Sequence, residues 1–191
     1  MPEADGRVRR GQRSGRAIVD ALLALIGEGM LEPTASQVAE RAGVGVRTVF
    51  RRFSDTEALF AGMAARMQAR VVPLFVARPR GGDLRHRTRA LVAQRAALFE
   101  LIAPYKRAAN LKRWRSPFLR GDHARLVREL RADLVRRLPE LRRASAAVVD
   151  ALELATSFEA WDRLRVEQDL GRERARAVVL RMALGLIEEL P

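Results

Sequence analysis

Apolar residues recur at helical spacing along almost the whole chain. The first stripe, Ile18, Leu22, Leu25 and Ile26, has the three- and four-residue steps of a helix with one buried face. No segment of the sequence alternates apolar and polar residues as a strand does, and no internal repeat of fixed period occurs. Ala, Leu and Arg, which lead the helix-propensity ranking, supply 31, 25 and 34 of the 191 residues. The sequence therefore predicts an all-α fold.

Capping and helix-breaking residues divide this pattern into about nine helices. Thr34–Gln37 and Ser54–Glu57 have the form of a capping box, and Ser116 with Pro117 forms an N-cap followed by proline. Pro73 is expected to kink or end the fourth helix, and Pro104 to end the fifth. The expected helices are 17–26, 35–42, 45–53, one from 54, 84–104, 105–114, 117–138, 144–165 and 172–190.

Several functional classes find no support in the composition. The chain has no cysteine, which excludes disulfides and Cys-based metal sites. His86 and His123 are its only histidines, and it has no glycine-rich phosphate loop. We therefore expect no catalytic residues, no metal and no cofactor. No stretch approaches 18 apolar residues and no secretory signal is evident, so we expect a cytoplasmic protein without a membrane partner.

The net charge of +13 does not by itself indicate a DNA-binding protein. Residues 105–143 contain 13 Lys and Arg residues against four acidic ones, so most of the excess lies outside the N-terminal segment. Arginine nevertheless presents a planar fork of donors that suits phosphate. Evidence for DNA binding must come from a local motif.

Residues 34–60 contain such a motif, in which two short helices meet across a tight turn. Ala39 is small where the helices must cross, Gly43 lies at the turn, and Val44 and Val49 close the contact from the other side. This pattern is typical of a helix-turn-helix, whose second helix enters the major groove of double-stranded DNA.

With these residues in view, the chain resembles the TetR family of bacterial transcriptional repressors. The similarity covers roughly the first 60 residues and comprises Arg16–Ile18, Gly29, Thr34, Val38, Ala39, Ala42–Val44, Thr48–Phe50, Phe53 and Glu57–Leu59. It implies a DNA-binding domain over residues 1–53, and a helical domain over 54–191 that binds a small-molecule effector and dimerises. The implied function is a ligand-responsive homodimeric repressor of a palindromic operator.

The candidate DNA-contacting residues follow from the outward face of the second helix of the motif. Val49 and Phe53 must point into the domain, which leaves Arg47 free to bond a guanine edge. The family commonly has Tyr at Phe50 and Lys at Thr56, so neighbouring arginines are expected to replace those phosphate contacts. The arginine-rich arm Arg7–Arg16 suits phosphate or minor-groove contact, or is a solvated tail. The predicted residues are Arg13, Ser36, Gly45, Val46, Arg47, Thr48, Phe50, Arg51 and Arg52.

Two helices near the C-terminus are apolar on more than one side, which predicts a dimer interface or, alternatively, a deeply buried pair in a monomer. The predicted interface residues are Val148, Leu152, Ala155, Val179, Ala183, Leu186 and Ile187.

An effector site is harder to place. Arg95 and His123 interrupt apolar stripes, and each needs a polar partner. An arginine stem reaching solvent and a histidine bonded to a backbone carbonyl are favoured over ligand contacts. The candidate ligand-binding residues are Arg95, Phe99, Tyr105, Asn110, Trp114, His123, Phe158 and Trp161.

Two other functions remain open. A non-specific architectural protein would coat DNA through its arginines. An arginine-rich helical adaptor would bind an anionic membrane or an acidic protein through residues 105–143.

Overall fold

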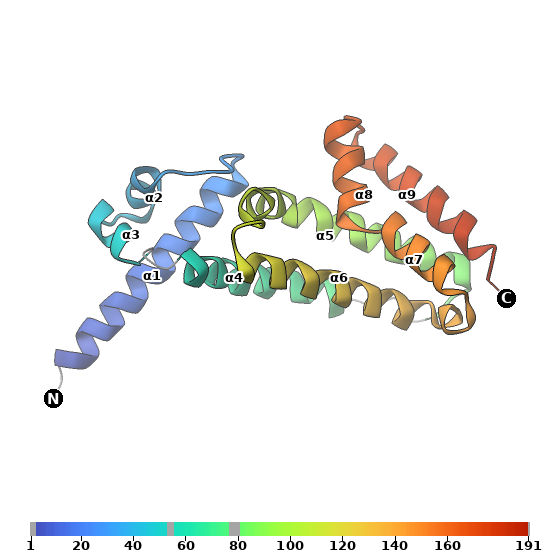
Figure 1. Cartoon of the computed structure of the whole chain (residues 1–191), viewed down its shortest axis with the longest axis horizontal. Helices are drawn as coiled ribbons and strands as arrows, with labels where there is room; N and C mark the ends of the chain where they lie inside the picture. The colour runs from blue at the N-terminus through green and yellow to red at the C-terminus, as the bar shows by residue number, and fades with distance from the viewer. Residues whose placement is uncertain (1–2, 53–55, 77–80, 191) are drawn as a thin grey trace. The chain divides into compact units, whose positions relative to one another are not determined.

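The computed structural model describes residues 3–52, 56–76 and 81–190, and no strand occurs among them. The helices are α1 (Glu3–Gly27), α2 (Ala35–Ala42), α3 (Val46–Arg52), α4 (Thr56–Val76), α5 (Leu84–Lys112), α6 (Pro117–Arg137), α7 (Ala146–Ala155), α8 (Phe158–Asp162) and α9 (Arg172–Ile187) (Figure 1). A 3-10 turn, η1 (Pro139–Arg143), precedes α7, and a π-helical turn, η2 (Arg163–Glu167), follows α8. The all-α prediction is confirmed.

The chain forms two compact units. The N-terminal unit comprises residues 1–70 and 104–122, and the C-terminal unit comprises 71–103 and 123–191. Helices α4, α5 and α6 each contribute residues to both units. These two units are the parts of the chain that pack compactly on themselves. The predicted boundary after residue 53 separates the DNA-binding part from the effector-binding part, and it stays a prediction.

Several of the predicted helix boundaries differ from those of the structure. Helix α1 begins at Glu3 rather than at 17, because the segment ahead of it consists mainly of helix-forming residues and holds no proline after residue 2. The fifth and sixth expected helices are one helix, α5, which continues through Pro104. Tyr105 and Ala108 pack into the core of the N-terminal unit, and this packing offsets the roughly 3 kcal/mol that an interior proline costs. Helix α4 likewise continues through Pro73 to Val76.

The eighth expected helix is broken at Thr156 and Ser157. The Ser157 hydroxyl caps a new helix by accepting a hydrogen bond from the Ala160 N–H at 3.1 Å. Thr156, which is buried, donates its hydroxyl hydrogen to the Leu152 carbonyl at 2.8 Å. Serine and threonine compete with the helix backbone in this way, which explains the break.

Candidate nucleic-acid interface

The start of α2 is fixed by Thr34 and Gln37, as the sequence predicts. The Thr34 hydroxyl accepts a hydrogen bond from the Gln37 N–H at 3.3 Å, and the Gln37 side chain accepts one from the Thr34 N–H at 2.8 Å. These two bonds satisfy backbone donors that no helical carbonyl can reach. The direction in which the chain enters α2 is thereby set.

The turn between α2 and α3 depends on Gly43. Its φ of 63° lies in the left-handed region, which a residue without a Cβ adopts at no steric cost. The Val44 N–H then bonds to the Ala39 carbonyl at 3.0 Å, which closes the end of α2. This geometry brings α3 back across α2.

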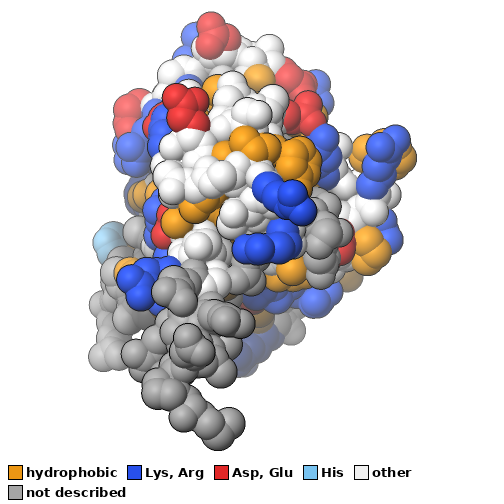
Figure 2. Space-filling model, turned by 90° about the vertical axis from the view of Figure 1, so that its left-hand side faces the viewer, with side chains coloured by type: hydrophobic (Ala, Val, Ile, Leu, Met, Phe, Trp, Pro, Cys, Tyr) orange, Lys and Arg blue, Asp and Glu red, His pale blue; other side chains and the backbone are white. Residues whose placement is uncertain are grey.

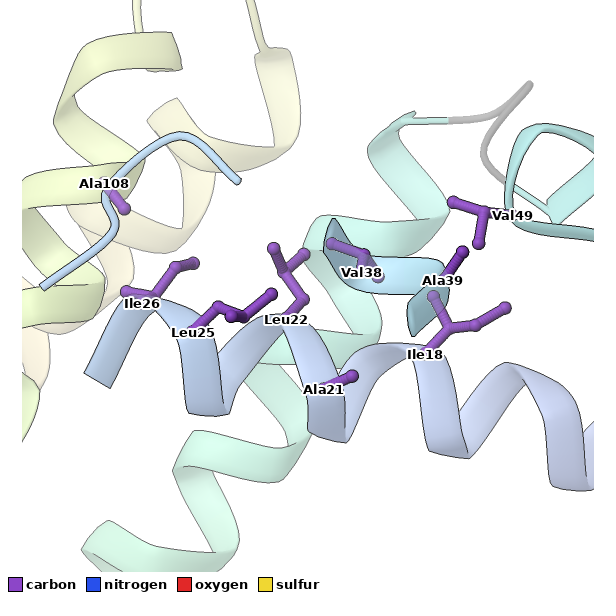
Figure 3. Packing of buried hydrophobic residues seen from close by; sticks show 9 residues of the cluster. All are labelled: Ile18, Ala21, Leu22, Leu25, Ile26, Val38, Ala39, Val49 and Ala108. Carbon is purple, nitrogen blue, oxygen red and sulfur yellow. The ribbon is translucent and has the colours of Figure 1, made fainter. Parts of the chain in front are cut away.

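A small apolar core holds α1, α2 and α3 together. Val49 of α3 is 1% exposed and lies with Ala39 of α2 near Ile18 of α1 (Figure 3). Leu59 and Met63 of α4 pack against the same core. A Cβ on Gly62 would come within 3.2 Å of the Val19 side chain, so α4 approaches α1 closely at this glycine.

Burial of Val49 leaves the rest of α3 facing outward. Gly45, Val46, Arg47, Phe50 and Arg51 are exposed, and Thr48 is partly buried. Arg47 forms no ion pair within the part of the chain that the structure describes, whereas Arg41 is held by the Glu28 carboxylate at 2.6 and 2.8 Å. The hydrogen bonds that Arg41 donates keep the pKa of the Glu28 carboxyl below its ordinary value.

The other predicted DNA contacts are placed as follows. Ser36 is exposed in the first turn of α2, and Arg13 is exposed on α1. The arm is therefore a helical extension of α1 in its backbone. The side chains of Arg7, Arg9, Arg10, Arg52 and Thr56, and the whole of Phe53, lie outside what the structure describes.

The segment 104–122 packs against this helix-turn-helix within the N-terminal unit. Ala108 belongs to the core of that unit, and Lys112 pairs with Glu32 in the loop between α1 and α2. The Glu57 carboxylate accepts a hydrogen bond from the Phe118 N–H at 2.8 Å, which caps α6. The sequence predicts the cap by Ser116, whose hydroxyl accepts a hydrogen bond from the Leu119 N–H. It does not predict the contact between Glu57 and Phe118, because 61 residues separate these two partners.

The predicted ligand-binding residues fall into both units. Tyr105, Asn110 and Trp114 belong to the N-terminal unit, where Trp114 is 67% exposed and Arg115 lies 4.1 Å from its ring centroid. The other five belong to the C-terminal unit, which brings two of them into contact: the Phe99 and Phe158 rings meet edge to face at 5.7 Å.

Arg95 does not reach solvent, contrary to the favoured interpretation. It is 3% exposed and donates hydrogen bonds to the Thr156 carbonyl at 2.7 Å and the Leu130 carbonyl at 2.6 Å. Burial lowers its pKa to about 10, although the negative charges of Asp133 and Glu153 act in the opposite direction. Among the residues that the structure describes, its Nε has no hydrogen-bond partner.

Two further candidates, Trp161 and His123, lie beside carboxylates. The Trp161 indole N–H donates to Glu100 at 3.0 Å, and His123 Nδ1 lies 3.9 Å from Glu159. Burial raises the pKa of Glu100, but hydrogen bonds from Arg165 and Trp161 outweigh it, so the net pKa is lowered. Sequence reasoning missed Glu100 because it lies 61 residues from Trp161.

Several residues predicted to form the dimer interface belong to the core of the chain itself. Leu152, Val179, Ala183 and Ile187 are buried where α7 packs against α9, because small and branched residues face each other there. Val148, Ala155 and Leu186 are partly buried. Leu154 of α7 and Met182 of α9, by contrast, are large apolar side chains that are exposed.

The described ranges, residues 3–52, 56–76 and 81–190, show neither a metal-binding cluster nor a membrane-spanning helix. No group of three or more His, Asp or Glu side chains there could hold a metal ion, and no helix there is long and apolar enough to cross a membrane.

Comparisons with known proteins agree with this geometry. Residues 18–63, from α1 to the first part of α4, match the family described as bacterial regulatory proteins, tetR family. The structure is also similar to the crystal structure of a transcriptional regulator from Rhodococcus sp. Rha1, with a TM-score of 0.67 and 20% identity over 94% of this chain and 97% of that chain. At this identity the likeness supports the fold. No curated relative matches the sequence.

Proposed function

We propose that this chain, a DNA-binding regulator of the TetR type, is a homodimeric repressor that binds a palindromic operator and releases it when a small-molecule effector binds. The observation that carries the proposal is the outward face of α3, which Val49 fixes by its burial and which exposes Arg47. Helices of this kind place their N-terminal residues against base edges in the major groove.

Arg47 and Thr48 lie in the first turn of α3, where base contacts are expected. An arginine can bond the O6 and N7 atoms of guanine with both arms of its fork. Ser36, Arg51, Arg52 and Arg13 are assigned to the phosphate backbone, which positions α3 but carries no sequence information.

A palindromic operator requires two copies of α3 about 34 Å apart. We assign the dimer contact to α7 and α9, whose exposed Leu154 and Met182 flank the buried side chains. The effector is assigned to the C-terminal unit, where the buried Nε of Arg95 has no hydrogen-bond partner among the described residues. Phe99, four residues after Arg95 on α5, meets the Phe158 ring edge to face. The regulator acts in the cytoplasm and performs no catalysis.

Selection from a random duplex library, followed by footprinting, tests the proposal. The expected result is an inverted repeat whose half-site centres lie about 10 base pairs, or a multiple of that, apart. Uniform protection without an enriched sequence would instead identify a non-specific architectural protein. Release of the footprint by a compound found in a thermal-shift screen tests the effector.

A further inference from the structure

Helix α3 exposes two apolar side chains next to its arginines. Val46 is 38% exposed and Phe50 is 63% exposed. They are four residues apart in one helix, so they lie side by side one turn apart. Figure 2 shows hydrophobic and basic side chains next to each other on the side of the molecule where α1, α2 and α3 lie in Figure 1.

The helix repeat fixes where this pair lies relative to the core. Each residue turns by about 100°, so Arg47 and Arg51 lie opposite the buried Val49. By the same rotation, Val46 and Phe50 form a stripe on one flank of the arginines, and Thr48 lies on the other flank. The face that would enter DNA is therefore divided into an apolar flank, a basic centre and a polar flank.

The apolar flank needs a partner that is itself apolar. A phenylalanine ring has no hydroxyl and cannot donate a hydrogen bond to phosphate. On the major-groove edges of the four bases, the C5-methyl group of thymine is the largest apolar feature, and the groups that distinguish the other bases donate or accept hydrogen bonds. The arginine stripe beside Val46 and Phe50 supplies the positive charge that brings a duplex to this face.

We propose that Val46 and Phe50 contact thymine C5-methyl groups in the operator, beside the base contacted by Arg47. This inference rests on the proposed function and specifies what α3 reads. Phe50 thereby contributes to sequence specificity rather than to positioning on the phosphates. Each operator half-site should contain one or two thymines whose methyl group matters.

The experiment replaces each thymine of the selected operator by deoxyuridine, one at a time, and measures the Kd at one fixed salt concentration. This replacement deletes only the methyl group and leaves base pairing intact. For the wild-type protein we expect the Kd to rise by about threefold to tenfold at one or two positions in each half-site, as the loss of one buried methyl group implies. The remaining positions should be unaffected.

The same duplexes are then measured with Phe50→Ala and, separately, with Val46→Ala, which removes both γ-methyl groups of the valine. The uridine effect should disappear at the position that the altered side chain contacts. Once one partner of a contact is removed, removing the other costs no further binding free energy. The matched control is Leu111→Ala, an exposed apolar residue of the same unit outside α3, which should retain the full uridine effect.

Specific operator binding that no uridine affects, or a uridine effect that persists in both α3 variants, would overturn this inference while leaving the proposed function standing. Failure to select any operator would overturn both. Circular dichroism confirms that each variant is folded.

Discussion

At the scale of single residues, the turn between α2 and α3 depends on the positive φ of Gly43. Alanine at this position should lower the free energy of unfolding by about 1 kcal/mol, because its Cβ is strained in the left-handed region. Apart from the two chain neighbours of Gly43, no described residue has an atom within 4 Å of the added Cβ, so the cost is conformational.

The matched control is Gly121→Ala, at an exposed glycine inside α6 whose added Cβ meets no described atom within 4 Å outside its own helix backbone and its chain neighbours. This substitution should raise the free energy of unfolding by about 0.5–1 kcal/mol, because alanine favours a helix interior. Urea denaturation of both variants checks the pair, and equal effects of the same sign would contradict the role assigned to Gly43.

At the scale of elements, η1 is tied to α5 by an ion pair between Glu140 and Arg87. Arg87 also donates to the Arg137 carbonyl at 3.1 Å. Hydrogen bonding from Arg87 lowers the pKa of Glu140 below its ordinary value of 4.5, although burial acts the other way. The folded carboxylate thus binds its proton less readily than the unfolded one, so its stabilising effect is complete above pH 4.5 and is lost as the pH falls through the lowered pKa.

Glu140→Gln should therefore reduce the loss of stability on acidification below pH 4.5. At neutral pH it should cost at most about 1 kcal/mol, since both side chains retain some solvent contact. Urea midpoints measured between pH 3 and 7 give the comparison. If the urea midpoint of the variant depends on pH as that of the wild-type protein does, the ion pair between Glu140 and Arg87 does not contribute to the pH dependence of stability.

The elements also show how far the sequence predicts the structure. Helix α2 has the predicted bounds because its signals, Thr34 with Gln37 and Gly43, are local. The continuity of α5 through Pro104 was not predicted, because it is associated with contacts between distant residues. The break after α7 was not predicted either, although Thr156 and Ser157 give it a local signal, because the apolar pattern continues past them. Thr156 meets Arg95 across 61 residues, and Ala108 packs with the core of α1.

The candidate site follows the same rule. The outward face of α3 follows from one buried residue, Val49, and helix geometry, so it could be predicted. The burial of Arg95 and of Leu152, a predicted interface residue, could not be predicted. An apolar stripe in a sequence does not reveal whether the same chain or a second copy covers it.

At the scale of the whole molecule, the proposed repressor must be a dimer. Sedimentation should give twice the chain mass of 21.4 kDa. Leu154→Glu and Met182→Glu, which place a charge on the exposed sides of α7 and α9, should shift the protein towards the monomer and weaken operator binding. Leu111→Glu, in the N-terminal unit, should leave the mass unchanged. A wild-type monomer bound to the full operator would contradict the proposed assembly.

The most direct test of sequence reading by α3 is the affinity of wild-type protein and Arg47→Ala for the selected operator and for a scrambled duplex of equal length, all at one salt concentration. The wild-type protein should prefer the operator by at least about a thousandfold. Arg47→Ala should lose about 1–3 kcal/mol of binding free energy on the operator and little on the scrambled duplex. Arg89→Ala, at an exposed arginine of the C-terminal unit, should behave as the wild type does. Equal wild-type affinity for both duplexes, or an Arg47→Ala variant that retains full preference for the operator, would contradict the account.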